Sequence, residues 1–218
     1  SVTGVLTCAL PISDVLCFSC YIWNMEYVET LVREIAKLCP RLPIWLGGPE
    51  VSYDAAAVLE RLPAVKGVMK GEGEETFAQL CRIYQKDWNE WEEAERKLLK
   101  MDGITFRRER TQEDLDGAEE ATEKIIENPW RPVMDLSRIP FVYKDMEKFR
   151  NKIIYYESSR GCPFSCSYCL SSVDKRLRFR DLELVKRELQ FFIDQEVPQV
   201  KFVDRTFNCR HEHALAIW

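Results

Sequence analysis

The front of the chain alternates short apolar runs with amphipathic stretches. Residues 14–21 form an apolar run with β-branched and aromatic members, which predicts a buried strand. Residues 26–38 carry apolar side chains three or four positions apart, which predicts a helix that Pro40 and Pro43 end. The same alternation predicts further strands at 44–46 and 67–70 and further helices at 54–61 and 75–84. Strands that alternate with helices through short glycine loops indicate a parallel α/β sheet.

The middle of the chain lacks this regular alternation. A charged helix is predicted over 88–100 and a small hairpin strand over 103–108. Three prolines lie between 128 and 142, which is typical of an extended connector. We therefore predict that residues 86–152 form a linker between domains, with some local structure.

A second domain is predicted to begin at residue 153 and to run to residue 218. A strand at 152–158 leads into a cysteine-containing loop at 159–172. An amphipathic helix follows at 181–195, and then a strand at 200–203. This order matches the first two steps of a parallel (β/α) barrel. We expect the barrel to be truncated, since 218 falls within what reads as its next helix.

Residues 1–12 resemble the translation of a sequencing-adapter oligonucleotide. The other interpretation is a native first strand over 2–10. We favour the adapter and leave this segment out of the fold, so that Cys8 has no biological role. The first domain then covers 13–85, and we expect it to be truncated at its N-terminus.

Composition excludes several classes of protein. With 46% hydrophobic and 31% charged residues, the chain is expected to pack a core rather than to be disordered. The net charge is −5 and no basic patch stands out, so nucleic-acid binding is not indicated. No run of about 18 apolar residues predicts a membrane span. The nine cysteines include a cluster of three, which indicates metal binding in a reducing cytoplasm rather than a disulfide framework.

The cysteine cluster has the spacing Cys-x3-Cys-x2-Cys, formed by Cys162, Cys166 and Cys169. Thiolates are soft ligands that select iron–sulfur clusters, zinc or cuprous copper. Three thiolates on one loop leave one iron of a [4Fe–4S] cluster open for a substrate, whereas an electron carrier uses four. Two alternatives remain: a four-cysteine electron carrier, and a structural zinc site. The zinc site would take a fourth ligand from Cys209, His211 or His213.

The segment YYESSRGCPFSCSYC resembles the cluster loop of radical S-adenosylmethionine (SAM) enzymes. The resemblance implies that Cys162, Cys166 and Cys169 bind a [4Fe–4S] cluster and that Tyr168 lies near the adenine of SAM. It also implies reductive cleavage of SAM to a 5′-deoxyadenosyl radical. The electron would come from a reductant such as flavodoxin or ferredoxin.

The loop after the second strand of this domain carries another candidate SAM contact. In the radical SAM family, polar residues at this strand end contact the amino group of SAM, often through a Gly-Gly-Glu motif. That motif is absent here, and Asp204 is the substitute, because a carboxylate accepts hydrogen bonds from an ammonium. The alternative is that Asp204 caps a turn.

Residues 14–80 resemble the Rossmann-like cobalamin-binding domain that precedes the radical domain in one branch of that family. A strand-end Ser19 is followed by strand-end glycines and then by a glycine-rich turn. The resemblance implies that cobalamin contacts Ser19, Gly47, Gly48, Pro49, Gly71, Glu72 and Gly73. We expect these loops to converge on one crevice at the carboxyl ends of the strands. The alternative is a generic α/β domain whose glycines only form turns.

These features together predict a cobalamin-dependent radical SAM enzyme, with methyl transfer as one reaction it could perform. One rival is a radical SAM enzyme that does not use cobalamin for methyl transfer. The other is an iron–sulfur or zinc module without catalysis. Because both ends are expected to be truncated, we predict that this chain alone does not turn over SAM.

Overall fold

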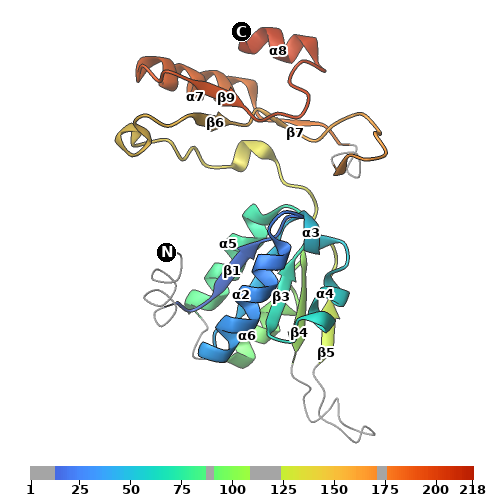
Figure 1. The fold of residues 1–218 in the computed structure, drawn as a ribbon. Helices are drawn as coiled ribbons and strands as arrows, with labels where there is room; N and C mark the ends of the chain where they lie inside the picture. The colour runs from blue at the N-terminus through green and yellow to red at the C-terminus, as the bar shows by residue number, and fades with distance from the viewer. Residues whose placement is uncertain (1–12, 87–90, 109–123, 171–175) are drawn as a thin grey trace, which may run out of the picture. The chain divides into compact units, whose positions relative to one another are not determined.

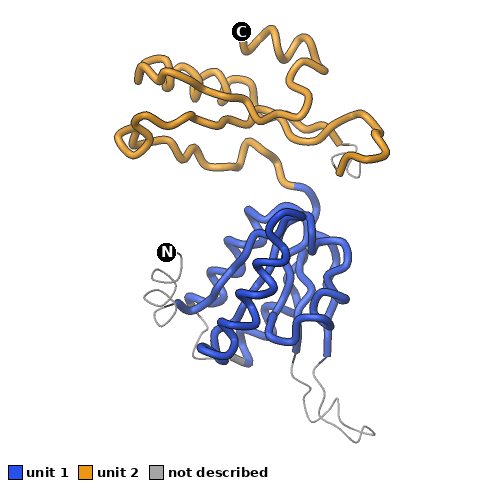
Figure 2. The backbone as a smooth tube through the Cα atoms, in the orientation of Figure 1, with its two compact units in different colours: residues 1–133 blue, residues 134–218 orange. Residues whose placement is uncertain are grey.

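The computed structural model describes residues 13–86, 91–108, 124–170 and 176–218. The chain divides into two compact units, residues 1–133 and 134–218 (Figure 2). Each unit has its own hydrophobic core. Among the described residues, no helix combines the length and the apolar character that crossing a bilayer requires.

A five-stranded sheet with the order β1-β2-β3-β4-β5 forms the centre of the first unit. Strands β1 (Leu16–Ser19), β2 (Ile44–Gly47) and β3 (Val65–Met69) run parallel, as the sequence predicts. Strand β4 (Ile104–Arg108) pairs antiparallel with β3, and β5 (Lys124–Glu127) pairs antiparallel with β4. The carboxyl ends of the three parallel strands therefore lie at one edge of the sheet.

Helices cover both faces of this sheet (Figure 1). Successive strand residues point to opposite faces, so Ile44 and Leu46 join one apolar cluster and Trp45 joins the other. The first cluster includes buried residues of α2 (Met25–Leu38), α3 (Pro49–Ser52) and α4 (Ala55–Arg61). The second includes residues of α5 (Gly73–Lys86) and α6 (Trp91–Leu98). This two-sided burial explains why the strands are apolar throughout.

The structure corrects the predicted linker at 86–152. Helix α6 buries Ala94 and Leu98 against the sheet, and β4 buries Ile104 and Phe106. The many charged residues of α6 hide its single apolar face from a reading of the sequence. Strand β4 pairs with the edge of β3, which would otherwise have no partner. Residues up to 133 therefore belong to the first unit, and those from 134 onward belong to the second.

The second unit contains the strand, helix and strand that the sequence predicts. Strand β6 (Ile154–Tyr156) pairs in parallel with β9 (Val200–Phe202). Helix α7 (Leu182–Asp194) lies between the two strands in the sequence. Asp181 starts α7 by accepting a hydrogen bond from the Leu184 N–H at 2.8 Å. Phe192 packs between the strands and residues 134–153, the segment that enters the unit.

The other elements of this unit are short. Strands β7 (Ser159–Arg160) and β8 (Arg178–Phe179) form a separate antiparallel pair. The entering segment contains the 3-10 turns η3 (Leu136–Arg138) and η4 (Met146–Phe149), and the chain ends in α8 (His211–Ile217).

Candidate functional site

The carboxyl edge of the first sheet brings together the loops that the sequence proposes for cobalamin. Ser19 and Gly47 are register partners, and the Cys20 N–H donates to the Gly47 carbonyl at 2.6 Å. Gly48 has a φ of +104°, and a Cβ there would lie 2.5 Å from the Cys20 carbonyl oxygen. Only glycine fits this position without strain, because other residues disfavour that φ and the space is filled by backbone. The first two loops are thus in direct contact.

Ser52 joins the second loop to the third. Its buried hydroxyl donates to the Gly48 carbonyl at 2.8 Å and accepts from the Gly71 N–H at 3.2 Å. The three predicted loops therefore lie side by side at one edge. The sequence reasoning missed Ser52, since a serine in a short helix carries no distinctive pattern.

Aromatic rings lie beside the third loop. Tyr53 and Trp130 are both about half exposed, with ring centroids 5.5 Å apart. A Cβ at Gly71 would contact the Trp130 ring at 3.4 Å, whereas one at Gly73 would meet no atom within 4 Å. Small residues with accessible backbone, next to exposed rings, fit a large and partly apolar ligand such as a corrinoid.

A buried lysine stabilises this edge of the sheet. The Lys70 ammonium donates to the Asn128 carbonyl at 2.7 Å and lies 5.4 Å from the Trp130 ring centroid. Burial lowers the pKa of Lys70. The Asn128 side chain in turn donates to the Leu98 and Met101 carbonyls at 2.7 and 2.8 Å. These bonds tie the ends of β3 and β5 together and hold Trp130 at the edge.

The cysteine loop of the second unit begins at β7 and returns at β8, which together close its base. Gly161 has a φ of +97°, and a Cβ there would lie 2.0 Å from the Arg176 carbonyl oxygen, so the turn into the loop requires glycine. Cys166 is exposed, and Cys162 and Cys169 are partly exposed. The Cys169 N–H donates to the Cys166 carbonyl at 3.2 Å, which forms a turn between them. Residues 171–172, the last two of the predicted loop, lie outside the described residues.

None of the described cysteines is in a disulfide, and thiols are soft metal ligands. Their donor chemistry fits an iron–sulfur cluster. Within the described ranges, however, no three His, Cys, Asp or Glu side chains are gathered closely enough to hold a metal ion. The same holds for sets that would add Cys209, His211 or His213, and the ligand assignment stays a prediction.

The proposed SAM residues differ in their surroundings. Tyr168 is 92% exposed, so its ring is accessible on the loop beside Cys169. The Asp204 carboxylate instead accepts three hydrogen bonds: from the Ser158 N–H at 2.8 Å and from the Ser158 and Ser159 hydroxyls at 2.6 Å each. The structure thus places Asp204 against the start of the cysteine loop, and its contact with SAM stays a prediction.

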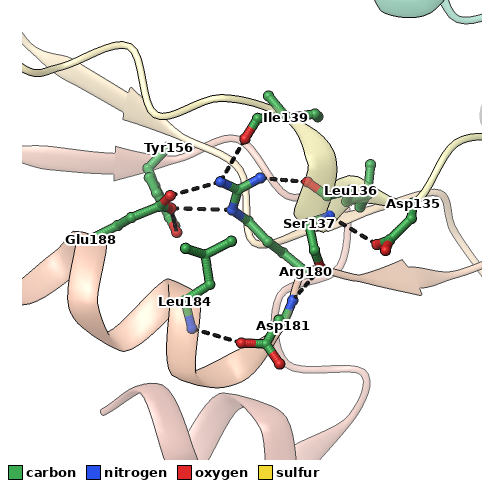
Figure 3. A network of polar contacts seen from close by, with 9 residues as sticks. All are labelled: Asp135, Leu136, Ser137, Ile139, Tyr156, Arg180, Asp181, Leu184 and Glu188. Atoms are coloured by element: carbon green, nitrogen blue, oxygen red, sulfur yellow. Dashed lines mark hydrogen bonds and ion pairs between the residues drawn. The ribbon is translucent and has the colours of Figure 1, made fainter.

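A buried ion pair lies in the second unit (Figure 3). The Arg180 guanidinium donates to both carboxylate oxygens of Glu188, at 2.7 and 3.1 Å. It also donates to the carbonyls of Leu136 and Ile139. The Tyr156 hydroxyl donates to Glu188 at 2.6 Å, and burial together with this carboxylate raises the pKa of Tyr156. The network joins β6, the residue after β8, α7 and the entering segment, and nothing in the sequence pattern singles out its members.

Known proteins resemble both units. Residues 13–81 match the family model of the B12 binding domain. The cobalamin-dependent radical SAM methyltransferase TokK of Streptomyces tokunonensis is 26% identical over 89% of this chain and 28% of its own length. The anaerobic magnesium-protoporphyrin IX monomethyl ester cyclase of Synechocystis is 30% identical over 60% of this chain and 23% of its own length. The chain thus spans less than a third of these relatives.

A solved structure shares the fold across the whole chain. The radical SAM methyltransferase TsrM from Kitasatospora setae, solved with cobalamin and a [4Fe–4S] cluster bound, matches with a TM-score of 0.65. The match covers 100% of this chain and 43% of TsrM, at 17% sequence identity. At that identity the likeness concerns the arrangement of the elements.

Proposed function

We propose that this chain, a cobalamin-binding radical SAM protein by its B12-binding domain and its relatives, is part of an enzyme that transfers methyl groups from SAM. The observation that carries the proposal is the presence in one chain of a B12-binding domain and a Cys-x3-Cys-x2-Cys loop. The first supplies a site for a methyl carrier, and the second supplies ligands for a cluster that leaves one iron open.

Each unit would contribute its own residues to this activity. Cys162, Cys166 and Cys169 would hold the cluster, which when bound supplies the electron that cleaves SAM. The exposed ring of Tyr168 is available to pack against the adenine. The loops at Ser19, Gly47–Pro49 and Gly71–Gly73 would hold cobalamin, because their glycines let a ligand approach the backbone closely. The abundant thiols fit a reducing cytoplasm, with flavodoxin or ferredoxin as the electron donor.

A second candidate is a radical SAM reaction without methyl transfer. The similarity to a magnesium-protoporphyrin IX monomethyl ester cyclase favours it, because that relative's name describes ring formation. The two candidates share the cluster and differ in the fate of the methyl group of SAM. A third possibility, a metal-binding module without catalysis, would bind metal and leave SAM intact.

The cluster is tested in the chain extended at both ends to the length of its relatives. Anaerobic reconstitution should give about four irons per chain. Cys166→Ala should abolish the iron and the brown colour, whereas the matched control Cys209→Ala, outside the motif, should keep both. One zinc per chain, or iron loss in Cys209→Ala as well, would contradict the cluster assignment in favour of a four-ligand site.

Methyl transfer is tested on the same protein with SAM that carries a labelled methyl group. The expected result is bound cobalamin, production of 5′-deoxyadenosine and methionine from one SAM, and appearance of the label on the corrinoid from a second SAM that leaves as S-adenosylhomocysteine. Gly73→Trp places a ring where a Cβ meets no atom within 4 Å and should weaken cobalamin binding without unfolding the unit. Production of 5′-deoxyadenosine with no labelled corrinoid would support the cyclase-like reaction instead. Intact SAM in the presence of a full cluster would support the non-catalytic module.

A further inference from the structure

Ser158 is the residue at which both arms of the cysteine loop are held. It lies two residues after the end of β6, directly before β7, and has no exposed surface. Its carbonyl accepts from the Arg180 N–H at 2.9 Å, which fixes the returning arm of the loop just after β8. Its N–H and hydroxyl both donate to the Asp204 carboxylate. Any displacement of Ser158 would therefore move both arms together.

Ser159 continues the same arrangement toward the loop. It is 2% exposed, donates its hydroxyl to Asp204 and is the register partner of Phe179 in the β7–β8 pair. Only Arg160 and Gly161 separate it from Cys162. The position of the first cysteine thus depends on how firmly Ser159 is held.

Asp204 reaches this point from the neighbouring strand. The parallel pair of β6 and β9 ends where the Val203 N–H donates to the Tyr156 carbonyl at 2.9 Å, and Asp204 is the next residue. Its carboxylate accepts three hydrogen bonds, and hydrogen bonds to an ionised acceptor are shorter and about twice as strong as neutral ones. Both oxygens are directed toward the serines, with one bond to Oδ1 and two to Oδ2.

We infer that Asp204 is a positioning residue that holds the base of the cysteine loop through Ser158 and Ser159. This inference rests on the proposed function, since it takes the loop as the cluster loop. It differs from the expectation that Asp204 contacts the SAM ammonium, because the carboxylate acts here on the protein's own backbone and hydroxyls.

The test compares Asp204→Ala and Ser159→Ala with the matched control Asp181→Ala in the reconstituted, extended protein. Asp181 also accepts a hydrogen bond in this unit, but it lies at the start of α7. Removal of iron by a chelator should be about tenfold faster in Asp204→Ala and Ser159→Ala, as expected when hydrogen bonds to a carboxylate are lost, and unchanged in Asp181→Ala. The electron paramagnetic resonance spectrum of the reduced cluster should shift in the first two variants only, and the double variant should add little to either single one.

Direct contact with SAM would give another result. Asp204→Ala would then weaken SAM binding while the chelator rate stayed normal, and Ser159→Ala would behave as wild type. That outcome overturns the inference and leaves the cluster assignment intact.

A measurement without iron separates this inference from the proposed function. In the metal-free chain, amide hydrogens of 159–161 and 178–180 should exchange faster in Asp204→Ala and Ser159→Ala than in wild type. If wild type bound no cluster, the proposed function would fail. The exchange result would still test whether Asp204 holds the base of the cysteine loop. Unchanged exchange in both variants would overturn the inference by itself.

Discussion

Replacing Arg180 by methionine should loosen the second unit more than any exposed substitution would. Methionine keeps much of the length of the side chain and removes the guanidinium. The side chains of Arg180 and Glu188 are each only 6% exposed, so water cannot readily take the place of the lost partner. Among the described residues, Glu188 would keep only the hydrogen bond from the Tyr156 hydroxyl.

The magnitude follows from what Arg180→Met leaves behind. Removing one partner of a buried ion pair costs about 3–5 kcal/mol, because an uncompensated charge stays buried. The carbonyls of Leu136 and Ile139 also lose their donor. A cost of 3 kcal/mol corresponds to an opening constant higher by about a hundredfold, since about 1.4 kcal/mol is a factor of ten. Changing Glu188 to glutamine in the same chain removes the stranded charge and should recover roughly 2 kcal/mol.

Native-state hydrogen exchange of the α7 amides measures this opening directly. Arg180→Met should speed their exchange by about a hundredfold or more, and Arg180→Met/Glu188→Gln should restore part of the protection. The control is Arg187→Met, since Arg187 is on the same helix and is exposed. The reasoning is refuted if Arg180→Met exchanges like wild type, or if the glutamine gives no recovery.

Two further predictions concern stability. Burial lowers the pKa of His213 in the folded chain, so as the pH falls the unfolded chain takes up a proton first. The neutral ring therefore contributes its full stability above about pH 6.5, the ordinary pKa of histidine. This stability is lost as the pH falls through the lower pKa of the folded chain. The second unit should therefore be less stable at pH 5 than at pH 7, and His213→Gln but not His211→Gln should reduce this slope in urea unfolding. In the first unit, Gly48→Ala should cost about 1–3 kcal/mol, because φ is positive and the new Cβ would clash with backbone. Gly73→Ala should be close to neutral, and equal melting temperatures of these two glycine variants would contradict the strain argument.

The sequence by itself determined the elements and the candidate chemistry. The parallel strands β1, β2 and β3 and the helices between them follow from local periodicity, because apolar spacing reports whether and on which side a segment is buried. The spacing of Cys162, Cys166 and Cys169 indicates soft-metal chemistry without any structure, since all three thiols lie on one short loop. The order of Ser19 and the glycine loops likewise indicated the carboxyl edge of the sheet.

Only the tertiary structure decided what meets across the chain. The predicted linker supplied β4 and β5, because the edge of β3 needs a partner and periodicity does not say where that partner comes from. Asp204 lies 46 residues from Ser158 in sequence, yet its carboxylate bonds to that serine. Arg180 likewise reaches the carbonyl of Leu136, 44 residues away. Such contacts depend on where two strands end in space, and a one-dimensional pattern of polar and apolar residues carries no record of that distance.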